Sequence, residues 1–365
     1  MAIKNNFALI KPASSLCNLD CKYCFYKDVA SNREVYSHKL MTYETLDNII
    51  ESYTNEATDS TTFLFQGGEP LLCGVDFFKH YNQKCQEVLA RKRKENPNFQ
   101  IFSSIQTSAF KLNEEFAQIF KEGDFLVGVS LDGPREYHDL NRLHGQNGTF
   151  DRVMQSIKIL KEYVISFNAL CVVTNKTYDK AKELIDFFVS QDILNLQFIP
   201  AIAPFDKKEI YIDDAKYAKF YVDSLETWYE YFTHGTVISI RHIEDLFTNI
   251  MYGSCQSCDM QGHCSNQNVI ESDGSIYPCD FYVIDKYKLG TVQNGIVNLN
   301  EAVLNSFLSY EAKRDGCTTC NFYRVCKGGC QRNRGHDDRS FLCKSFKSLN
   351  QKHLAMIEDV VRKIR

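Results

Sequence analysis

The feature that most constrains this chain is a cysteine loop near its amino terminus, Cys17-Asn-Leu-Asp-Cys21-Lys-Tyr-Cys24-Phe-Tyr26. Cysteine thiolates hold iron–sulfur clusters, and three thiolates on a cluster with four irons leave one iron open to bind a substrate. Zinc is the alternative, but zinc loops usually come as Cys-x-x-Cys pairs that a second pair completes. The Cys-x-x-x-Cys-x-x-Cys spacing therefore favours a cluster over zinc.

The composition is that of a globular protein and limits the classes of partner. Of the 365 residues, 44% are hydrophobic and 24% are charged, and the net charge of −4 gives no electrostatic basis for binding nucleic acid. We expect no membrane segment, because no apolar run approaches about 18 residues and the amino terminus lacks a signal-like core. The expected location is cytoplasmic, where fifteen cysteines indicate metal binding rather than disulfides.

Short apolar runs alternate with amphipathic stretches from residue 6 to about residue 235. The runs expected as strands are Phe7–Ile10, Thr62–Phe65, Ile101–Ile105, Phe125–Leu131, Val164–Val173 and Leu196–Ile199. Alternation of this kind indicates parallel βα units, and six of them would form a partial barrel or an open α/β sheet. We therefore predict one domain over residues 1–235 and a second, cysteine-rich domain over residues 236–365.

Polar, turn-forming residues follow several of these predicted strands. Gln66-Gly67-Gly68-Glu69-Pro comes after the second strand, and Ser130 ends the fourth. The active sites of parallel α/β folds lie at the carboxyl ends of the strands, although Gly-Gly and Gly-Pro pairs also mark ordinary turns. Two glycines allow the backbone to approach a ligand closely, and the carboxylate and exposed carbonyls suit an ammonium group.

Cysteine dominates the last third of the chain. The segment Cys317-x-x-Cys320-x-x-x-x-x-Cys326-x-x-x-Cys330 holds four cysteines within 14 residues. This density indicates a metal site, for which a zinc ribbon is the structural alternative to a cluster.

Together these motifs resemble the radical S-adenosylmethionine (SAM) superfamily with a SPASM extension, and most closely the anaerobic sulfatase-maturating enzymes. The segments that carry this resemblance are 10–15, 24–26, 65–70, 258–264, 271–275, 277–283, 285–286 and 327–330. The resemblance implies a partial (β/α)6 barrel radical SAM domain followed by a SPASM-like domain with a carboxyl-terminal helix. It also implies SAM and three [4Fe–4S] clusters as cofactors.

The resemblance assigns the ligands position by position. The SAM-binding cluster would take Cys17, Cys21 and Cys24, the first auxiliary cluster Cys258, Cys264, Cys279 and Cys330, and the second Cys317, Cys320, Cys326 and Cys343. Residues expected at the cofactor are Gly67, Gly68 and Glu69 for the SAM amino group, Ser130 for its ribose and Arg142 for its carboxylate. Tyr26 and Gln66 are expected to line the substrate channel or to pack against the cluster.

The family oxidises a cysteine or serine of a sulfatase to Cα-formylglycine, through a 5′-deoxyadenosyl radical that removes a hydrogen from Cβ. The implied partners are a sulfatase with a Cys/Ser-x-Pro/Ala-x-Arg motif and a reducing donor such as a flavodoxin or ferredoxin. By resemblance the base is Asp280, next to Cys279, with Asp285 as a second candidate. The alternative for Asp280 is a loop aspartate that caps a turn.

Two other functions remain open at this stage. One is another radical SAM peptide maturase, which would form thioether or carbon–carbon links or epimerised residues. The other is a non-catalytic metal-binding or electron-transfer protein, which would not need the open cluster together with Gln-Gly-Gly-Glu-Pro. Cys255 departs from the family pattern as a spare thiol or an alternative ligand. The sequence leaves open the choice between cysteine and serine, the sulfatase, the electron donor and the oligomeric state.

Overall fold

The computed structural model describes residues 6–203, 212–334 and 338–364 and forms two compact units. The first unit combines the chain up to Ser130 with Asn141–Phe167 and Ser265–Phe307, and the second combines Leu131–Leu140 and Asn168–Cys264 with the chain from Leu308 onward. Both units thus join segments that are distant in sequence. The domain boundary predicted near residue 235 stays a prediction.

The first unit contains a mixed sheet in the order β13-β12-β11-β10-β1-β2-β3-β4. Its strands are β1 (Phe7–Lys11), β2 (Ser60–Phe65), β3 (Gln100–Thr107), β4 (Phe125–Ser130), β10 (Val269–Glu271), β11 (Ser275–Tyr277), β12 (Gly290–Gln293) and β13 (Ile296–Leu299). Strands β10, β1, β2, β3 and β4 are parallel, whereas β10 to β13 form an antiparallel meander. Strand β10, from the cysteine-rich part of the sequence, therefore extends the sheet that begins at the amino terminus.

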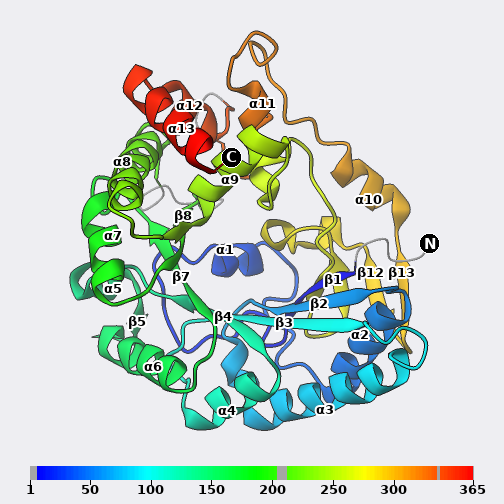
Figure 1. The fold of residues 1–365 in the computed structure, drawn as a ribbon. Coiled ribbons are helices and arrows are strands. Elements are labelled where there is room, and N and C mark those ends of the chain that lie inside the picture. Colours follow the sequence, from blue (N-terminus) through cyan, green and yellow to red (C-terminus); the bar gives the residue numbers. More distant parts are fainter. Residues whose placement is uncertain (1–5, 204–211, 335–337, 365) are drawn as a thin grey trace. The chain divides into compact units, whose positions relative to one another are not determined.

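Helices α2, α3 and α4 lie along one face of this sheet (Figure 1). The helices of the unit are α1 (Phe25–Ser31), α2 (Tyr43–Asn55), α3 (Val75–Lys92), α4 (Glu114–Glu122), α6 (Phe150–Glu162) and α10 (Glu301–Leu308). Short elements are the 3-10 helices η1 (Pro70–Cys73), η3 (Asp280–Tyr282) and η4 (Asp285–Tyr287) and the hairpin β5 (Leu143–His144) with β6 (Asn147–Gly148). Leu46, Ile49 and Ile50 of α2 are buried, as their helical spacing predicts.

The interface between the sheet and α3 is rich in aromatic side chains. Phe65 of β2 contacts Phe78 and Tyr81 of α3 edge to face, with ring centroids 5.4 and 4.9 Å apart. Each such ring stabilises the folded state by about 1.5–3 kcal/mol through burial. The helices thereby fix one face of the sheet and leave the carboxyl ends of its strands to the loops.

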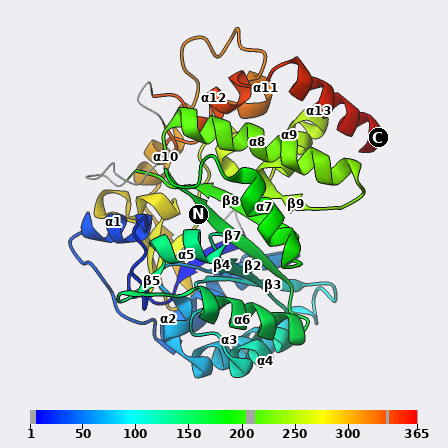
Figure 2. The ribbon, with the colours of Figure 1, turned by 90° about the vertical axis from the view of Figure 1, so that its left-hand side faces the viewer.

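The second unit is built around three parallel strands, β7 (Phe167–Val173), β8 (Asn195–Pro200) and β9 (Ser239–Ile240). Its other elements are α5 (Arg135–Asn141), α7 (Ala181–Ser190), α8 (Asp214–Thr233), α9 (Arg241–Tyr252), η2 (Cys258–Met260), α11 (Tyr323–Cys326), α12 (Phe341–Lys347) and α13 (Gln351–Ile364). Helix α8 packs against both α7 and α12 (Figure 2). The carboxyl-terminal helix predicted from the sequence is α13.

The predicted α/β class is confirmed, and all six predicted strands are present as β1, β2, β3, β4, β7 and β8. Most strand ends differ from the prediction by one or two residues, and the largest difference is at the fifth strand, which begins at Phe167 rather than at Val164. Val164 is 83% exposed and has φ 56°, and its N–H donates to the carbonyl of Lys161. The predicted run thus begins in the turn between α6 and β7, which the run of apolar residues does not reveal.

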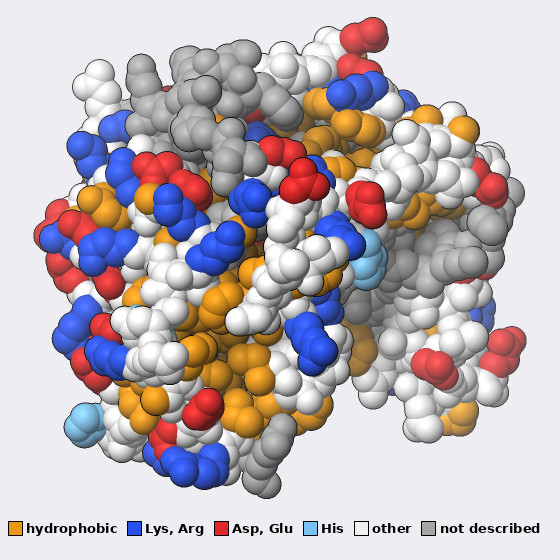
Figure 3. Space-filling view, turned by 90° about the horizontal axis from the view of Figure 1, so that it is seen from above, with side chains coloured by type: hydrophobic (Ala, Val, Ile, Leu, Met, Phe, Trp, Pro, Cys, Tyr) orange, Lys and Arg blue, Asp and Glu red, His pale blue; other side chains and the backbone are white. Residues whose placement is uncertain are grey.

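The charged side chains carry both signs, as the near-neutral composition predicts. On the face shown in Figure 3, Lys and Arg side chains are interspersed with Asp and Glu. Among the described residues, no helix combines the length and the apolar character that crossing a membrane requires.

Candidate active site

The centre of the candidate site is a buried ion pair between β1 and η3, both in the first unit. Strand β10 lies parallel to β1 and places Glu271 opposite Lys11. Strand β11 then ends at Tyr277, and the chain passes through Cys279 into η3, which begins at Asp280. Lys11 is fully buried and its ammonium pairs with Asp280, whose side chain keeps 10% of its surface exposed. The sheet thus brings a cation and an anion together from opposite ends of the sequence.

The Asp280 carboxylate is held at both oxygens. Lys11 donates to Oδ1. Gln66, the residue directly after β2, donates from Nε2 to Oδ2 at 2.9 Å. The backbone N–H of Asp280 donates to Gln267 Oε1 at 3.3 Å. Because an ionised carboxylate has about four lone-pair positions, each oxygen can accept a further proton or hydrogen bond. The structure therefore brings together the predicted residues Asp280 and Gln66.

The Lys11 side chain passes between an aromatic ring and a glycine. Its ammonium lies 3.9 Å from the centroid of the Tyr26 ring, which is a cation–π contact. On Gly67, which has φ +116°, a Cβ would lie 2.8 Å from Lys11 Cγ and 2.9 Å from Nζ. The first glycine of Gln-Gly-Gly-Glu-Pro therefore makes room for Lys11, a role that the sequence did not reveal.

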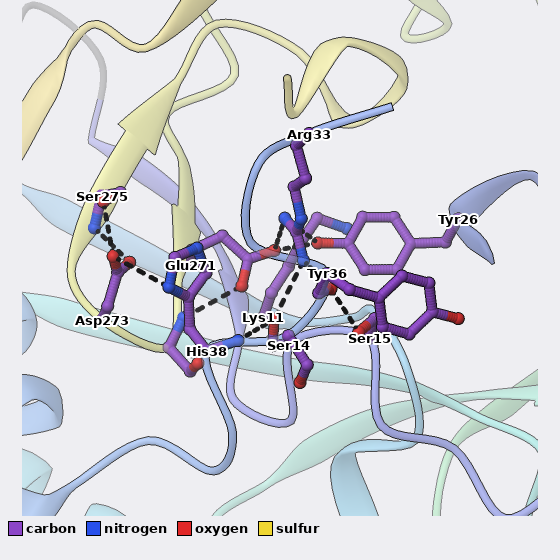
Figure 4. A network of polar contacts seen from close by, with 12 residues as sticks. Lys11, Ser14, Ser15, Tyr26, Arg33, Tyr36, His38, Glu271, Asp273 and Ser275 are labelled. Carbon is purple, nitrogen blue, oxygen red and sulfur yellow. Dashed lines mark hydrogen bonds and ion pairs between the residues drawn. The ribbon is translucent and has the colours of Figure 1, made fainter. Parts of the chain in front are cut away.

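Tyr26 belongs to a second buried network, which Figure 4 shows from close by. Its hydroxyl donates to Glu271, which also accepts a hydrogen bond from Arg33 Nη1 at 2.8 Å. Arg33 Nη2 donates to Ser14 Oγ at 3.1 Å. Burial raises the pKa of Glu271 to about 7, and the Ser14 hydroxyl and the charge of Lys11 act against that increase. The network ties the segment after the cysteine loop to β10.

The cysteine loop brings its three thiols near one another. Cys24 directly precedes α1. Desolvation raises the pKa of Cys17 to about 12, and the neighbouring Glu69, Cys21 and Cys24 groups raise it further, whereas the Leu19 N–H opposes this. A coordinating metal ion deprotonates such a thiol outright. The three predicted ligands thus lie close enough to interact electrostatically.

Glu69 is buried and connects two loops. Its carboxylate accepts hydrogen bonds from Thr107 Oγ1 at 2.6 Å and from the Ser108 N–H at 2.9 Å. Its backbone N–H donates to the Leu16 carbonyl, and a Cβ on Gly68 would lie 2.2 Å from that same oxygen. The carboxylate is therefore occupied by protein donors, so any ammonium group would rely mainly on backbone carbonyls of this loop.

Two further predicted cofactor residues lie near these loops or at the end of a strand. Arg142 is buried, its guanidinium lies 5.3 Å from the centroid of the Tyr23 ring, and its charge acts to lower the pKa of Cys24. Burial outweighs that effect and raises this thiol's pKa. Ser130 is half-buried at the carboxyl end of β4. Their expected contacts with SAM stay predictions.

In the second unit, the four cysteines predicted for one auxiliary cluster line a single cavity, namely Cys317, Cys320, Cys326 and Cys343. Desolvation raises the pKa of Cys326 to about 11, and the other three thiols contribute to the increase. Arg314, Arg334 and Arg339 also line the cavity. Four convergent thiols beside cations suit a cluster whose ligated form carries negative charge.

The other predicted auxiliary ligands are divided between the two units. In the second unit, Cys258 lies near Cys264 and Cys330. Desolvation raises the pKa of the Cys258 thiol to about 12, and the two neighbouring thiols add to the increase. Gln331 Nε2 donates to Cys264 Sγ at 3.3 Å. Cys279 belongs to the first unit, where it precedes η3. This ligand set stays a prediction.

Cys255 has a different environment. Its Sγ accepts a hydrogen bond from Asn249 Nδ2 at 3.2 Å and donates to the Ser257 carbonyl at 3.4 Å. Desolvation raises its pKa, and Asp245 and Asp259 are the main charges that add to the increase. These partners fit a spare thiol.

Among residues 6–203, 212–334 and 338–364, no three His, Cys, Asp or Glu side chains form a group that could hold one metal ion. A tetrahedral zinc site needs its ligands around one atom, whereas an iron–sulfur cluster spreads them around several iron atoms.

Reasoning from the sequence missed Lys11, Arg33 and Glu271 as parts of the site. A signal was available for Lys11, because it ends the apolar run Phe-Ala-Leu-Ile of a predicted buried strand. A lysine at such a position has to be paired, which predicts a carboxylate nearby. Its partner could not be read from the sequence.

Comparison with known proteins gives a consistent assignment. The family model described as "Radical SAM superfamily" matches residues 12–188. A cysteine-type anaerobic sulfatase-maturating enzyme from Clostridium novyi is 39% identical over 99% of this chain and 98% of its own length. A serine-type enzyme from Bacteroides thetaiotaomicron is 28% identical over 98% of this chain and 91% of its own length.

Solved structures agree. Native anSMEcpe with bound AdoMet and the Cp18Cys peptide superposes with a TM-score of 0.87 at 35% identity, over 98% of this chain and 99% of that one. Because 98% of this chain is covered, the resemblance extends over both units.

Proposed function

Because the chain belongs to the anaerobic sulfatase-maturating enzymes of the radical SAM superfamily, we propose that it oxidises a cysteine side chain of a sulfatase to Cα-formylglycine. The preference for cysteine over serine is supported by the greater identity to cysteine-type than to serine-type relatives. The expected substrate is a polypeptide segment with a Cys-x-Pro-x-Arg type of motif, and a flavodoxin or ferredoxin is the expected reductant.

The proposal includes three [4Fe–4S] clusters. Cys17, Cys21 and Cys24 would hold the one that binds SAM, and the two sets of four cysteines named above would hold the auxiliary pair. When bound, SAM and the first cluster would together supply the 5′-deoxyadenosyl radical that removes a hydrogen atom from Cβ, and the auxiliary clusters would supply the acceptor for the electron that must leave. Arg142 would orient SAM through its carboxylate, because a guanidinium can bind a carboxylate through two hydrogen bonds.

The observation that carries the proposal is the Asp280 carboxylate, which is nearly buried, is fixed by two donors and keeps 10% of its side-chain surface exposed. Asp280 would take the proton of the substrate thiol. Loss of a hydrogen atom, a proton and an electron converts the CH₂–SH group into a thioaldehyde, and water then replaces sulfur with oxygen. A base held in a fixed position typically contributes about 10²–10⁴-fold to such a reaction.

The test uses the full chain, reconstituted with iron and sulfide without oxygen, together with SAM, a reductant and matched peptides that carry Cys-x-Pro-x-Arg or Ser-x-Pro-x-Arg. Mass spectrometry reads the peptide, and chromatography reads 5′-deoxyadenosine. We expect the aldehyde from the cysteine peptide, and less of it from the serine peptide. Deoxyadenosine without a change in peptide mass would overturn this reaction and favour a different peptide maturase.

Replacement of Asp280 by Asn is the first prediction. Asp280→Asn keeps the size of the side chain and removes the base, so we expect the aldehyde rate to fall at least about 100-fold while SAM cleavage continues. The matched control is Asp285→Asn, because Asp285 is exposed and accepts a hydrogen bond from the Glu34 N–H at 2.8 Å. Full activity of Asp280→Asn, or equal losses in both variants, would remove Asp280 from the reaction.

A further inference from the structure

We propose that Lys11 is a positioning residue for this reaction, which fixes the Asp280 carboxylate in the orientation that receives the substrate proton. The inference rests on the proposed function and adds to it a residue that acts through another. Lys11 is not expected to touch the substrate, because its side chain is fully buried.

The first argument is the cost of placing Lys11 where it is. An ammonium group without exposed surface is strongly destabilising unless a partner compensates its charge. Its ion-pair partner is Asp280, and the Tyr26 ring, 3.9 Å from Nζ, covers another side of the ammonium. A neutral apolar residue would fill the end of β1 with less cost, so the charge has a purpose at this place.

The second argument is the space around the lysine stem. Gly67 lies so close that a Cβ there would be within 2.8 Å of Lys11 Cγ and 2.9 Å of Nζ. Contact with Gly67 on one side and with Tyr26 on another restricts the rotamers of a side chain that is otherwise flexible. The donor that faces Asp280 is therefore held in one place.

The third argument comes from a second buried ion pair in the same unit. Arg33 and Glu271 have side chains 1% and 0% exposed, and donors occupy both oxygens of that carboxylate. In the pair of Lys11 and Asp280, the lysine is as buried but the aspartate keeps 10% of its side-chain surface accessible. The pair of Arg33 and Glu271 is thus enclosed, whereas the pair of Lys11 and Asp280 leaves part of its carboxylate accessible to a substrate.

The geometry at Asp280 follows from this. Lys11 holds Oδ1 and Gln66 holds Oδ2, so rotation of the carboxylate would break one of the two hydrogen bonds. Without Lys11, the Gln66 hydrogen bond would be left to oppose rotation of the carboxylate about its terminal torsion, which is soft for aspartate. Misplacement of a base by about 1 Å is enough to cost about 10²-fold in rate.

The experiment compares Lys11→Met with Lys84→Met in the reconstituted full chain. Lys84 is the matched control because it also forms an ion pair in the first unit, with Glu51 at 2.8 Å, on helices far in sequence from the site. For Lys11→Met we expect kcat for the aldehyde to fall about 30–100-fold and the ratio of deoxyadenosine to aldehyde to rise by a similar factor. The peptide KM should change less than about threefold, because Lys11 does not contact the peptide. Lys84→Met should leave the ratio unchanged.

A second variant separates positioning from folding. Lys11→Met combined with Asp280→Asn leaves no unpaired buried charge, so it is expected to fold even if Lys11→Met alone does not. If Lys11 acts through Asp280, the double variant loses aldehyde activity within about twofold of Asp280→Asn alone. Lys11→Arg, which retains the charge, should recover part of the product ratio.

Three results would overturn the inference. One is a product ratio in Lys11→Met equal to that of the parent. Another is a double variant whose loss is the product of the two single losses. The last is a loss of aldehyde that follows cluster absorbance and deoxyadenosine in equal proportion, which indicates a structural role. Failure of the parent protein to form aldehyde would instead contradict the proposed function, so the two failures are distinguishable.

Discussion

The two thiol-rich regions of the molecule differ in what fixes their geometry. The cysteine loop of the first unit leads into α1, whose Tyr26 and Val29 pack into an apolar cluster with Leu9, Val269 and Val283. Two buried ion pairs lie beside this cluster. The protein itself therefore holds the loop in place.

The four-thiol cavity of the second unit is built from loops and short helices. Cys326 ends the four-residue helix α11 and Cys343 lies in the seven-residue helix α12, and the backbone between them is left-handed at Lys327 and has φ 94° at Gly328. A Cβ on Gly328 would lie 2.5 Å from the Ala312 carbonyl oxygen, so the loops pack backbone against backbone. The cavity is lined by thiols, which must lose their protons to ligate a cluster, and by guanidinium groups, whose positive charge favours the thiolates.

This difference has a chemical reason. A site with an open iron has to keep its shape while substrates enter and leave, so the surrounding protein must supply the rigidity. A fully ligated cluster is closed, and it can organise its own loops because metal binding is coupled to folding. We therefore expect the two regions to respond differently to the same kinds of change.

The largest expected effect separates the two regions by activity. Cys24→Ala should lower SAM cleavage below about one hundredth of the parent rate, because loss of a ligand exceeds the 10–100-fold cost of losing an outer partner. Cys326→Ala should retain SAM cleavage while iron content falls by up to about four atoms per chain. Deoxyadenosine assays and iron analysis check both variants. Equal loss of deoxyadenosine in the two would show that the regions are not independent.

The next effect concerns the stability of the first unit without iron. Arg33→Met removes the cation of the buried ion pair with Glu271, so we expect the free energy of unfolding to fall by about 3–5 kcal/mol. The double variant Arg33→Met, Glu271→Met should lose less, since no charge is then left buried alone. Denaturant unfolding of iron-free protein measures both. A loss below about 1 kcal/mol in the single variant would contradict the view that protein contacts hold this loop.

The smallest effect concerns the core of the second unit, apart from its thiols. His242 is buried, its Nε2 lies 2.9 Å from Ser224 Oγ, and burial lowers its pKa to about 3. In the unfolded chain this histidine takes up a proton near its ordinary pKa of about 6.5, whereas in the folded protein it stays neutral until about pH 3. Stability from this group is therefore complete above about pH 6.5 and falls as the pH decreases toward 3.

We expect a loss of about 1–2 kcal/mol between about pH 6.5 and pH 5 from this one group. His242→Gln, which cannot take up a proton, should reduce that pH dependence by the same amount, and thermal unfolding of iron-free protein at several pH values measures it. An unchanged slope in the variant would show that His242 is not the group responsible.

The sequence predicted much of the fold and only part of the site. The six strands were predicted because apolar runs of suitable length alternate with amphipathic helices. The largest error was at residues 164–166, because apolar residues of the turn after α6 continue into the strand without a change in pattern. The candidate base and Gln66 were named from motifs. Their partner Lys11 was not, because pairing between residues 269 positions apart leaves no local pattern.

The sequence by itself determined the local chemistry, because cysteine spacing and the Gln-Gly-Gly-Glu-Pro turn depend on residues that are neighbours in the chain. It thereby led to the family, the cofactor class and the thiol groups. Only the tertiary structure decided that β10 pairs with β1, so that a segment from the cysteine-rich part of the sequence completes the first unit. The physical reason is that backbone hydrogen bonds between parallel strands do not depend on the side chains. Which strand pairs with which is decided by the burial of both side-chain faces within the folded unit. The burial of Lys11 against Asp280 follows from that pairing, and with it the orientation of the candidate base.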